Sequence, residues 1–98
     1  MRGIREDSPA TEAYEAALER WKRADDVWQG VTWTLARDPE TPDSVPLNEG
    51  GTVRAYTSEG ARSIDMPTLT VLYQFDNEYI TIREALFADA KAPFAGRA

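Results

Sequence analysis

Hydrophobic residues in the first third of the chain recur at helical spacing. The stripe comprises Tyr14, Ala17, Leu18, Trp21, Ala24 and Trp28. Steps of three, four and seven residues place side chains on one face of an α-helix. Ser8 and Pro9 precede the stripe. A hydroxyl can cap the first free amides of a helix, and proline fits its first turn. We therefore predict that a helix starts at this point, with Ser8 as its cap.

A second apolar face starts at Val27 and continues through Val31 and Leu35. The pair Asp25-Asp26 precedes it, and aspartate is a common residue at a new helix N-terminus. We therefore predict two helices with a break near this pair, and one long helix over residues 9–38 is the alternative. The second helix should end at Asp38, because a residue before proline avoids the α region. Residues 38–51 carry three prolines and a Gly-Gly pair, which indicates a loop.

The second half of the chain has the alternating pattern of β-strands. Residues 68–75 alternate, with Leu69, Val71, Tyr73 and Phe75 on one side. Asp76-Asn77 then provides a tight turn, so residues 79–87 are predicted to form the partner strand of a hairpin. Residues 52–56 predict an earlier strand, followed by a turn at 58–60. Residues 1–7 contain a single aliphatic side chain suited to burial, and they form either an edge strand or a flexible arm.

These elements predict an α+β fold in which two N-terminal helices pack on a small antiparallel sheet of three to four strands. A chain of 98 residues corresponds to one domain, here a helical half at 8–38 and a sheet half at 52–87. Residues 1–7 and 88–98 are expected to be flexible ends or edge elements. Phe94 is the one apolar anchor candidate in the tail.

Composition narrows the possible chemistry. The chain has no cysteine and no histidine, so disulfides and thiolate metal sites are excluded and the commonest general base is missing. We expect no cofactor and no metal. There are 11 basic and 17 acidic residues, a net charge of −6. Residues 1–49 carry six basic and 11 acidic side chains, a net charge of −5. Nucleic acid and anionic membranes are therefore repelled at long range, and any polyanion must contact the second half.

No apolar run approaches the roughly 20 residues that span a bilayer, and the first residues do not resemble a signal peptide. The sequence therefore favours a cytoplasmic protein that makes no membrane contact.

Arginine and tyrosine side chains are the main binding candidates in the sheet half. Arg54 and Tyr56 share a strand face by the period of two. By the same period, Arg83 shares a face with Tyr79, Thr81 and Phe87. If these faces meet on the exposed side of the sheet, they form an Arg/Tyr patch that could hold phosphate or stack a base. The alternative is ordinary solvated strand arginines. Arg62, in the segment between two strands, is the remaining basic candidate.

Trp33 is the other binding candidate. It lies about half a turn away from the second apolar face, at about 100° per residue. An exposed indole often marks a protein interface, because aromatic anchors dominate interface energetics. The sequence thus offers Trp33 as a contact with a protein partner, and the other two tryptophans as core residues.

Three sequence segments together resemble the RelE/ParE-type toxin superfamily of toxin–antitoxin systems. They are LARDP at 35–39, VR at 53–54 and VLYQFD at 71–76, in the order helix, helix, strand, hairpin. The resemblance implies a compact bacterial toxin with two helices across an antiparallel sheet. Members of the RelE branch cut mRNA in the ribosome, and members of the ParE branch poison gyrase. Each is neutralised by an antitoxin segment wrapped over it.

Two positions differ from the RelE-branch nucleases. Thr70 stands where they generally carry arginine, and Ala88-Asp89-Ala90 stands where they carry basic residues. Phosphodiester cleavage needs a proton acceptor, a proton donor and cations for the developing charge. We therefore predict a toxin-like protein that mainly binds and inhibits a macromolecular target of the gyrase or ribosome type and is neutralised by a partner antitoxin.

Two alternatives remain open. One is a weak ribosome-dependent mRNA interferase that uses Arg54, Arg62 and Arg83, together with Tyr73 or Tyr56, and so contacts RNA. The other is an acidic inhibitor from a phage or mobile element that binds a basic host protein, which the negative first half favours. The oligomeric state is not specified by the sequence.

Overall fold

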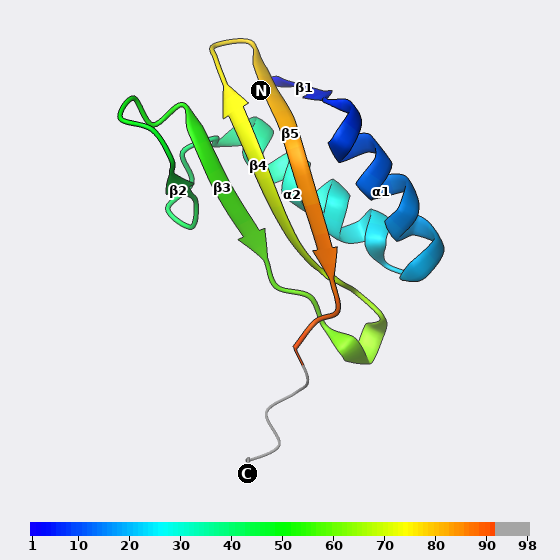
Figure 1. The fold of residues 1–98 in the computed structure, drawn as a ribbon. Helices are drawn as coiled ribbons and strands as arrows, with labels where there is room; N and C mark the ends of the chain where they lie inside the picture. The colour runs from blue at the N-terminus through cyan, green and yellow to red at the C-terminus, as the bar shows by residue number, and fades with distance from the viewer. Residues whose placement is uncertain (92–98) are drawn as a thin grey trace.

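The computed structural model describes residues 1–91, which form two helices packed on one face of a five-stranded sheet (Figure 1). The strand order is β1-β5-β4-β3-β2. All neighbours pair antiparallel except β1 and β5, which are parallel. The α+β prediction is confirmed, but the sheet has more strands than expected and is mixed. Its strands are β1 (Gly3–Glu6), β2 (Val45–Pro46), β3 (Val53–Ser58), β4 (Thr68–Phe75) and β5 (Tyr79–Ala88).

Both added strands lie at the edges of the sheet. Residues 1–7 form an edge strand rather than a flexible arm, because the backbone of β1 pairs in register with β5 and the Asp7 amide donates to the carbonyl of Ile82. Strand β2 lies inside the predicted loop at 38–51 and pairs with β3 through two residues. The predicted turn at 58–60 starts later, since β3 extends through Ser58 and a short 3-10 helix, η1 (Arg62–Ile64), follows. Phe94 lies outside the described residues.

The helical region consists of two helices, as the preferred prediction stated. Helix α1 (Ser8–Arg20) ends where Trp21 becomes extended, and α2 (Ala24–Arg37) ends before Asp38. The capping prediction for Ser8 is wrong, because Asp7 is the cap residue and makes no side-chain capping bond. The cap residue of α2 is Arg23, so the Asp25-Asp26 pair lies in the first turn. Carboxylates there still favour the helix, because they face its positive dipole end.

Leu18 was predicted to be buried with the first stripe, and it is 45% exposed. The inward face of α1 instead carries the small residues Ala10 and Ala17, which let the helix approach β5 closely. Tyr14 lies at the edge of this face and packs against Trp28 of α2, with ring centroids 4.9 Å apart. A fixed spacing of three and four residues includes Leu18, but only a narrower strip of α1 reaches the sheet.

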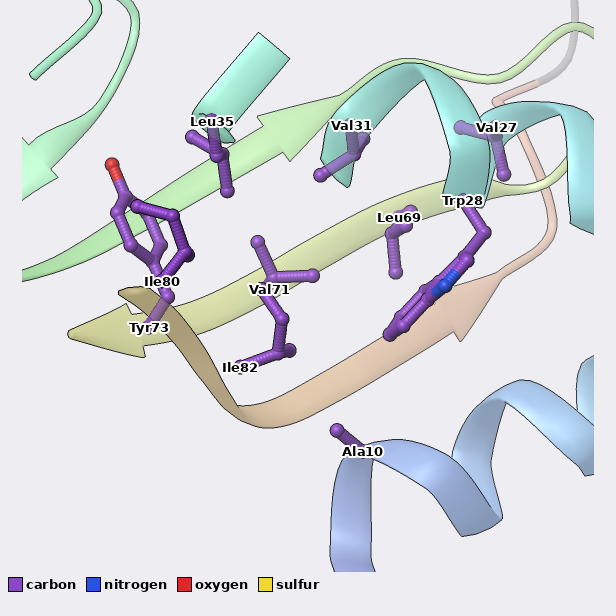
Figure 2. Packing of buried hydrophobic residues seen from close by; sticks show 10 residues of the cluster. All are labelled: Ala10, Val27, Trp28, Val31, Leu35, Leu69, Val71, Tyr73, Ile80 and Ile82. Carbon is purple, nitrogen blue, oxygen red and sulfur yellow. The ribbon is translucent and has the colours of Figure 1, made fainter. Parts of the chain in front are cut away.

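The hydrophobic core lies between α2 and the central strands (Figure 2). The inward residues predicted for β4 are confirmed, since Leu69, Val71 and Tyr73 are fully buried. Burial of an aliphatic side chain of this size contributes roughly 1.5–3 kcal/mol. The core is completed by Ala10 from α1, by Val27, Trp28, Val31 and Leu35 from α2, and by Ile80 and Ile82 from β5.

A β-bulge changes the alternation of side chains along β5. Ile82 pairs with Tyr73 but Glu84 pairs with Leu72, so Arg83 is an extra residue in this strand. The inward positions therefore change from even to odd numbers, and Phe87 stacks on Trp28 at 6.0 Å between ring centroids. The expectation that Arg83 and Phe87 share a face is wrong, because a bulge interrupts the period of two.

Candidate functional site

The sheet face opposite the helices is not covered by any helix or strand of residues 1–91, and we call it the open face (Figure 1). Residues that pair directly across neighbouring strands form rows of side chains on this face. One row joins Val53, Gln74, Thr81 and Arg5, and the next joins Val45, Ala55, Leu72 and Glu84. A third row joins Thr57, Thr70 and Leu86.

Apolar side chains and threonine make up most of the middle of the open face, together with Gln74 on β4 and Glu84 on β5. Val53 and Leu72 are partly buried by their neighbours in the sheet, although no helix lies over them. Leu86 is 66% exposed and Val45 is 58% exposed, at opposite sides of this region. A contiguous surface of apolar side chains rimmed by polar ones is typical of a protein interaction site.

Cationic side chains line one border of the open face. The Arg5 guanidinium carbon lies 3.5 Å from the ring centroid of Tyr79, a cation–π contact. The Arg83 Nε lies 2.7 Å from Asp7 Oδ2, and its Nη1 donates to Gln74 Oε1 at 2.6 Å. Each guanidinium thus has a defined position before any partner arrives, which lowers the entropic cost of binding. The arrangement can accept an apolar surface in its centre and carboxylate or phosphate groups along this border.

The predicted Arg/Tyr patch on the exposed face therefore has a different composition. Arg83, Tyr79 and Thr81 do lie on the open face, but Arg54 and Tyr56 lie on the helix side. Arg54 pairs in register with the buried Tyr73, and directly opposite residues point to the same face.

Arg54 has a structural role on the helix side. Its Nε donates to Ser44 Oγ at 2.7 Å, and its Nη1 donates to the carbonyl of Gly51 at 3.2 Å. Arg54 therefore ties the loop after α2 to β3. The neighbouring Tyr73 hydroxyl donates to the carbonyl of Pro39, and burial raises the pKa of Tyr73 above 10.

Arg62 lies in η1, at the lower end of the molecule as drawn in Figure 1. Its Nε donates to the carbonyl of Ala90 at 2.6 Å. Arg54, Arg62 and Arg83 thus occupy three places, namely the helix side of β3, η1 and the open face of β5. The fold does not bring these three arginines together into one site.

Trp33 is exposed, as its helical phase predicted, with 56% of its surface accessible. The Arg37 guanidinium carbon lies 4.3 Å from its ring centroid, one turn further along α2. Both residues lie on the side of α2 that faces away from the sheet. Trp33 and the open face are consequently on opposite sides of the protein.

Sequence reasoning missed Arg5 and also the apolar residues of the open face, such as Leu72 and Leu86. Residues 1–7 contain one aliphatic side chain, and their partner strand lies more than 70 residues away in the sequence. The alternation of Gly3, Ile4 and Arg5 was the available signal, since it would place the arginine opposite the apolar side chain.

Within residues 1–91, no three acidic side chains lie close enough together to hold a metal ion. Neither of the two described helices has the length and apolar character that a bilayer crossing requires. No protein-family model, curated protein or solved structure matches this chain.

Proposed function

We propose that this protein acts by binding a macromolecular partner through the open face. The single observation that carries this proposal is a five-stranded sheet with helices on one face only and an apolar centre on the other. The polar groups of that face are arginine, glutamine, threonine, tyrosine and the carboxylate of Glu84, and the chain has no histidine or cysteine. Such side chains are suited to recognition, because acid–base catalysis generally requires groups that titrate near neutral pH.

We further propose that this protein is a bacterial toxin of the RelE/ParE type, which binds an inhibited target and is neutralised by an antitoxin. Two observations support this proposal. Two helices precede a strand and an antiparallel hairpin, as the resemblance implies, although β1 comes before the helices and β2 follows them. The segment 71–76, which carries much of the resemblance, forms the central strand of the sheet and the start of its hairpin turn.

Inhibition would follow from occlusion. A target surface that presents apolar side chains and carboxylates, or phosphates, would be covered by the open face and would lose its normal partner. Because Trp33 and the open face lie on opposite sides of the protein, an antitoxin segment would have to wrap around an edge of the sheet to contact both. Trp33 would then contribute to neutralisation rather than to target binding.

Controlled expression in a bacterial host tests this function. The wild-type chain should arrest growth, and a small protein encoded next to it should relieve the arrest and co-purify as a stable complex. Arg5→Glu together with Arg83→Glu should weaken the arrest at an equal protein level, since the border of the open face then repels an acidic target. Harmless expression of the wild type, with no co-purifying partner, would refute the proposal.

A further inference from the structure

A polar cleft lies away from the open face, where the turn between α1 and α2 meets η1. It is a shallow cleft of about 610 Å³. Its polar lining comprises Lys22, Arg23, Asp26, Arg62, Ser63 and Asp65. Three cations and two carboxylates give this cleft a positive balance on a protein whose net charge is −6.

Backbone bonds fix the two walls of the cleft relative to each other. The Lys22 amide donates to Asp65 Oδ2 at 2.8 Å, and the Arg23 amide donates to the Asp65 carbonyl at 3.1 Å. Asp65 adopts the left-handed conformation, with φ of 55°. Aspartate tolerates this region better than most residues, and here its Oδ2 and its carbonyl oxygen both accept amides from the turn between the helices. These bonds therefore hold the two sides of the cleft in fixed positions in the folded protein.

Both carboxylates of the cleft already have partners. Asp26 Oδ2 accepts a bond from Arg23 Nη1 at 2.9 Å, and Asp65 Oδ2 accepts the Lys22 amide. In contrast, within residues 1–91 no acceptor pairs with the Lys22 ammonium or with the terminal nitrogens of Arg62. Two positive groups with unused donors thus line the same cleft.

Arg62 has donors that an anion could use. Its Nε donates to the Ala90 carbonyl at 2.6 Å, and within residues 1–91 this bond leaves Nη1 and Nη2 for a ligand. Paired N–H donors of this kind match two oxygens of a phosphate. Ser63 also lines the cleft and adds a hydroxyl donor. Ile64, 45% exposed, adds an apolar side chain to the lining.

We propose that this cleft binds the phosphate group of a small phosphate monoester. The Arg62 fork would hold two phosphate oxygens, and Lys22 and Ser63 would hold the third. A monoester dianion fits better than a carboxylate, because three separate donor side chains line the cleft and a carboxylate has only two oxygens. The site is independent of the partner-binding function, since it uses no residue of the open face.

Inorganic phosphate is the direct probe. Backbone amide NMR signals of the full-length protein would be followed during titration at constant ionic strength, with chloride as the exchanged ion. The signals of residues 22, 23, 62, 63 and 65 should shift and saturate with a Kd on the order of 1 mM, the strength of a few charge-assisted bonds. Phosphate should also raise the Tm, because it binds the folded state only.

Three variants separate recognition from folding and from net charge. Arg62→Lys keeps the positive charge but removes the paired Nη1 and Nη2 donors of the guanidinium. Lys22→Gln removes the charge of an ammonium group that makes no internal bond in the described structure. Each should weaken phosphate binding about tenfold or more while the remaining NMR spectrum is preserved. Arg37→Gln removes one positive charge at the far end of α2, roughly 20 Å away by helix rise, and should bind phosphate as the wild type does. Equal responses to phosphate and chloride in the wild type, or equal weakening by Arg37→Gln, would overturn the proposal.

Discussion

At the scale of single residues, polar side chains of this protein mostly position the backbone. The Tyr14 hydroxyl donates to Asp25 Oδ1 and so joins α1 to α2. Arg54 joins a loop to a strand, and Asp76 closes the hairpin between β4 and β5 through its Oδ1. Such side chains would be read from sequence as solvated, because their partners are distant or lie in the backbone.

The Tyr14–Asp25 bond predicts a specific alkaline instability. The bond to the Asp25 carboxylate, more than burial, raises the pKa of Tyr14 to about 12, against 10 for a free tyrosine. The stabilisation is therefore complete below pH 10 and is lost as the pH rises towards 12. Tyr14→Phe should cost about 1 kcal/mol at pH 8 and less as the pH approaches 12. Urea unfolding of both proteins from pH 8 to 12 measures this difference, and a constant difference would show that the bond does not act.

Asp76 predicts a loss of stability at low pH. Its Oδ1 accepts the amides of Glu78 and Tyr79, each at 2.8 Å, and these bonds lower its pKa below 3.8. The stabilisation is therefore present above pH 3.8 and is lost as the pH falls through the lowered value. Asp76→Ala should have a lower Tm than the wild type at pH 7 and a Tm that approaches the wild-type value in strong acid. An identical Tm at pH 7 would contradict this role.

At the scale of elements, sequence pattern located the helices and the central hairpin, left residues 1–7 open between an edge strand and an arm, and missed β2. Strand β4 was predicted with its exact bounds, because Leu69, Val71 and Tyr73 alternate without interruption. Strand β1 has one aliphatic residue and pairs across most of the chain, so it left little local signal. The bulge at Arg83 depends on which residue pairs with Leu72, and alternation within one strand does not specify that pairing.

The pairing between strands, which alternation does not specify, also limited the prediction of the candidate site. Alternation correctly grouped Arg83 with Tyr79 and grouped Arg54 with Tyr56. It did not determine which pair faces the helices, because that depends on the register between β3 and β4. Once Tyr73 is identified as a core residue, its register partner Arg54 must also lie on the helix side.

The different roles of two arginines provide a test at this scale. Arg54→Ala removes three side-chain bonds to the segment at 44–51 and should cost about 2–3 kcal/mol of unfolding free energy. Arg83→Ala removes an exposed ion pair and should cost less than about 1 kcal/mol. Chemical denaturation measures both values. A larger loss for Arg83→Ala would contradict the assignment of Arg54 to structure and Arg83 to the binding face.

At the scale of the whole molecule, the three surfaces are separate. The helices cover one face of the sheet and carry Trp33 on their outer side, the opposite face is open, and the basic cleft lies at one end. The acidic surplus belongs mainly to the half of the sequence that contains the helices, whereas Arg5 and Arg83 border the open face. A partner approaching the open face therefore meets a different electrostatic surface from one that approaches the helices.

The most direct test compares two exposed leucines, one on the open face and one on a helix. Leu86 lies on the open face, 66% exposed, and Leu18 lies on α1, 45% exposed. Leu86→Glu and Leu18→Glu make the same chemical change, and both variants should fold with wild-type circular dichroism. Each would be immobilised and compared with the wild type for retention of the co-purifying partner. The partner should be lost from Leu86→Glu and retained by Leu18→Glu, and equal retention by both would contradict binding through the open face.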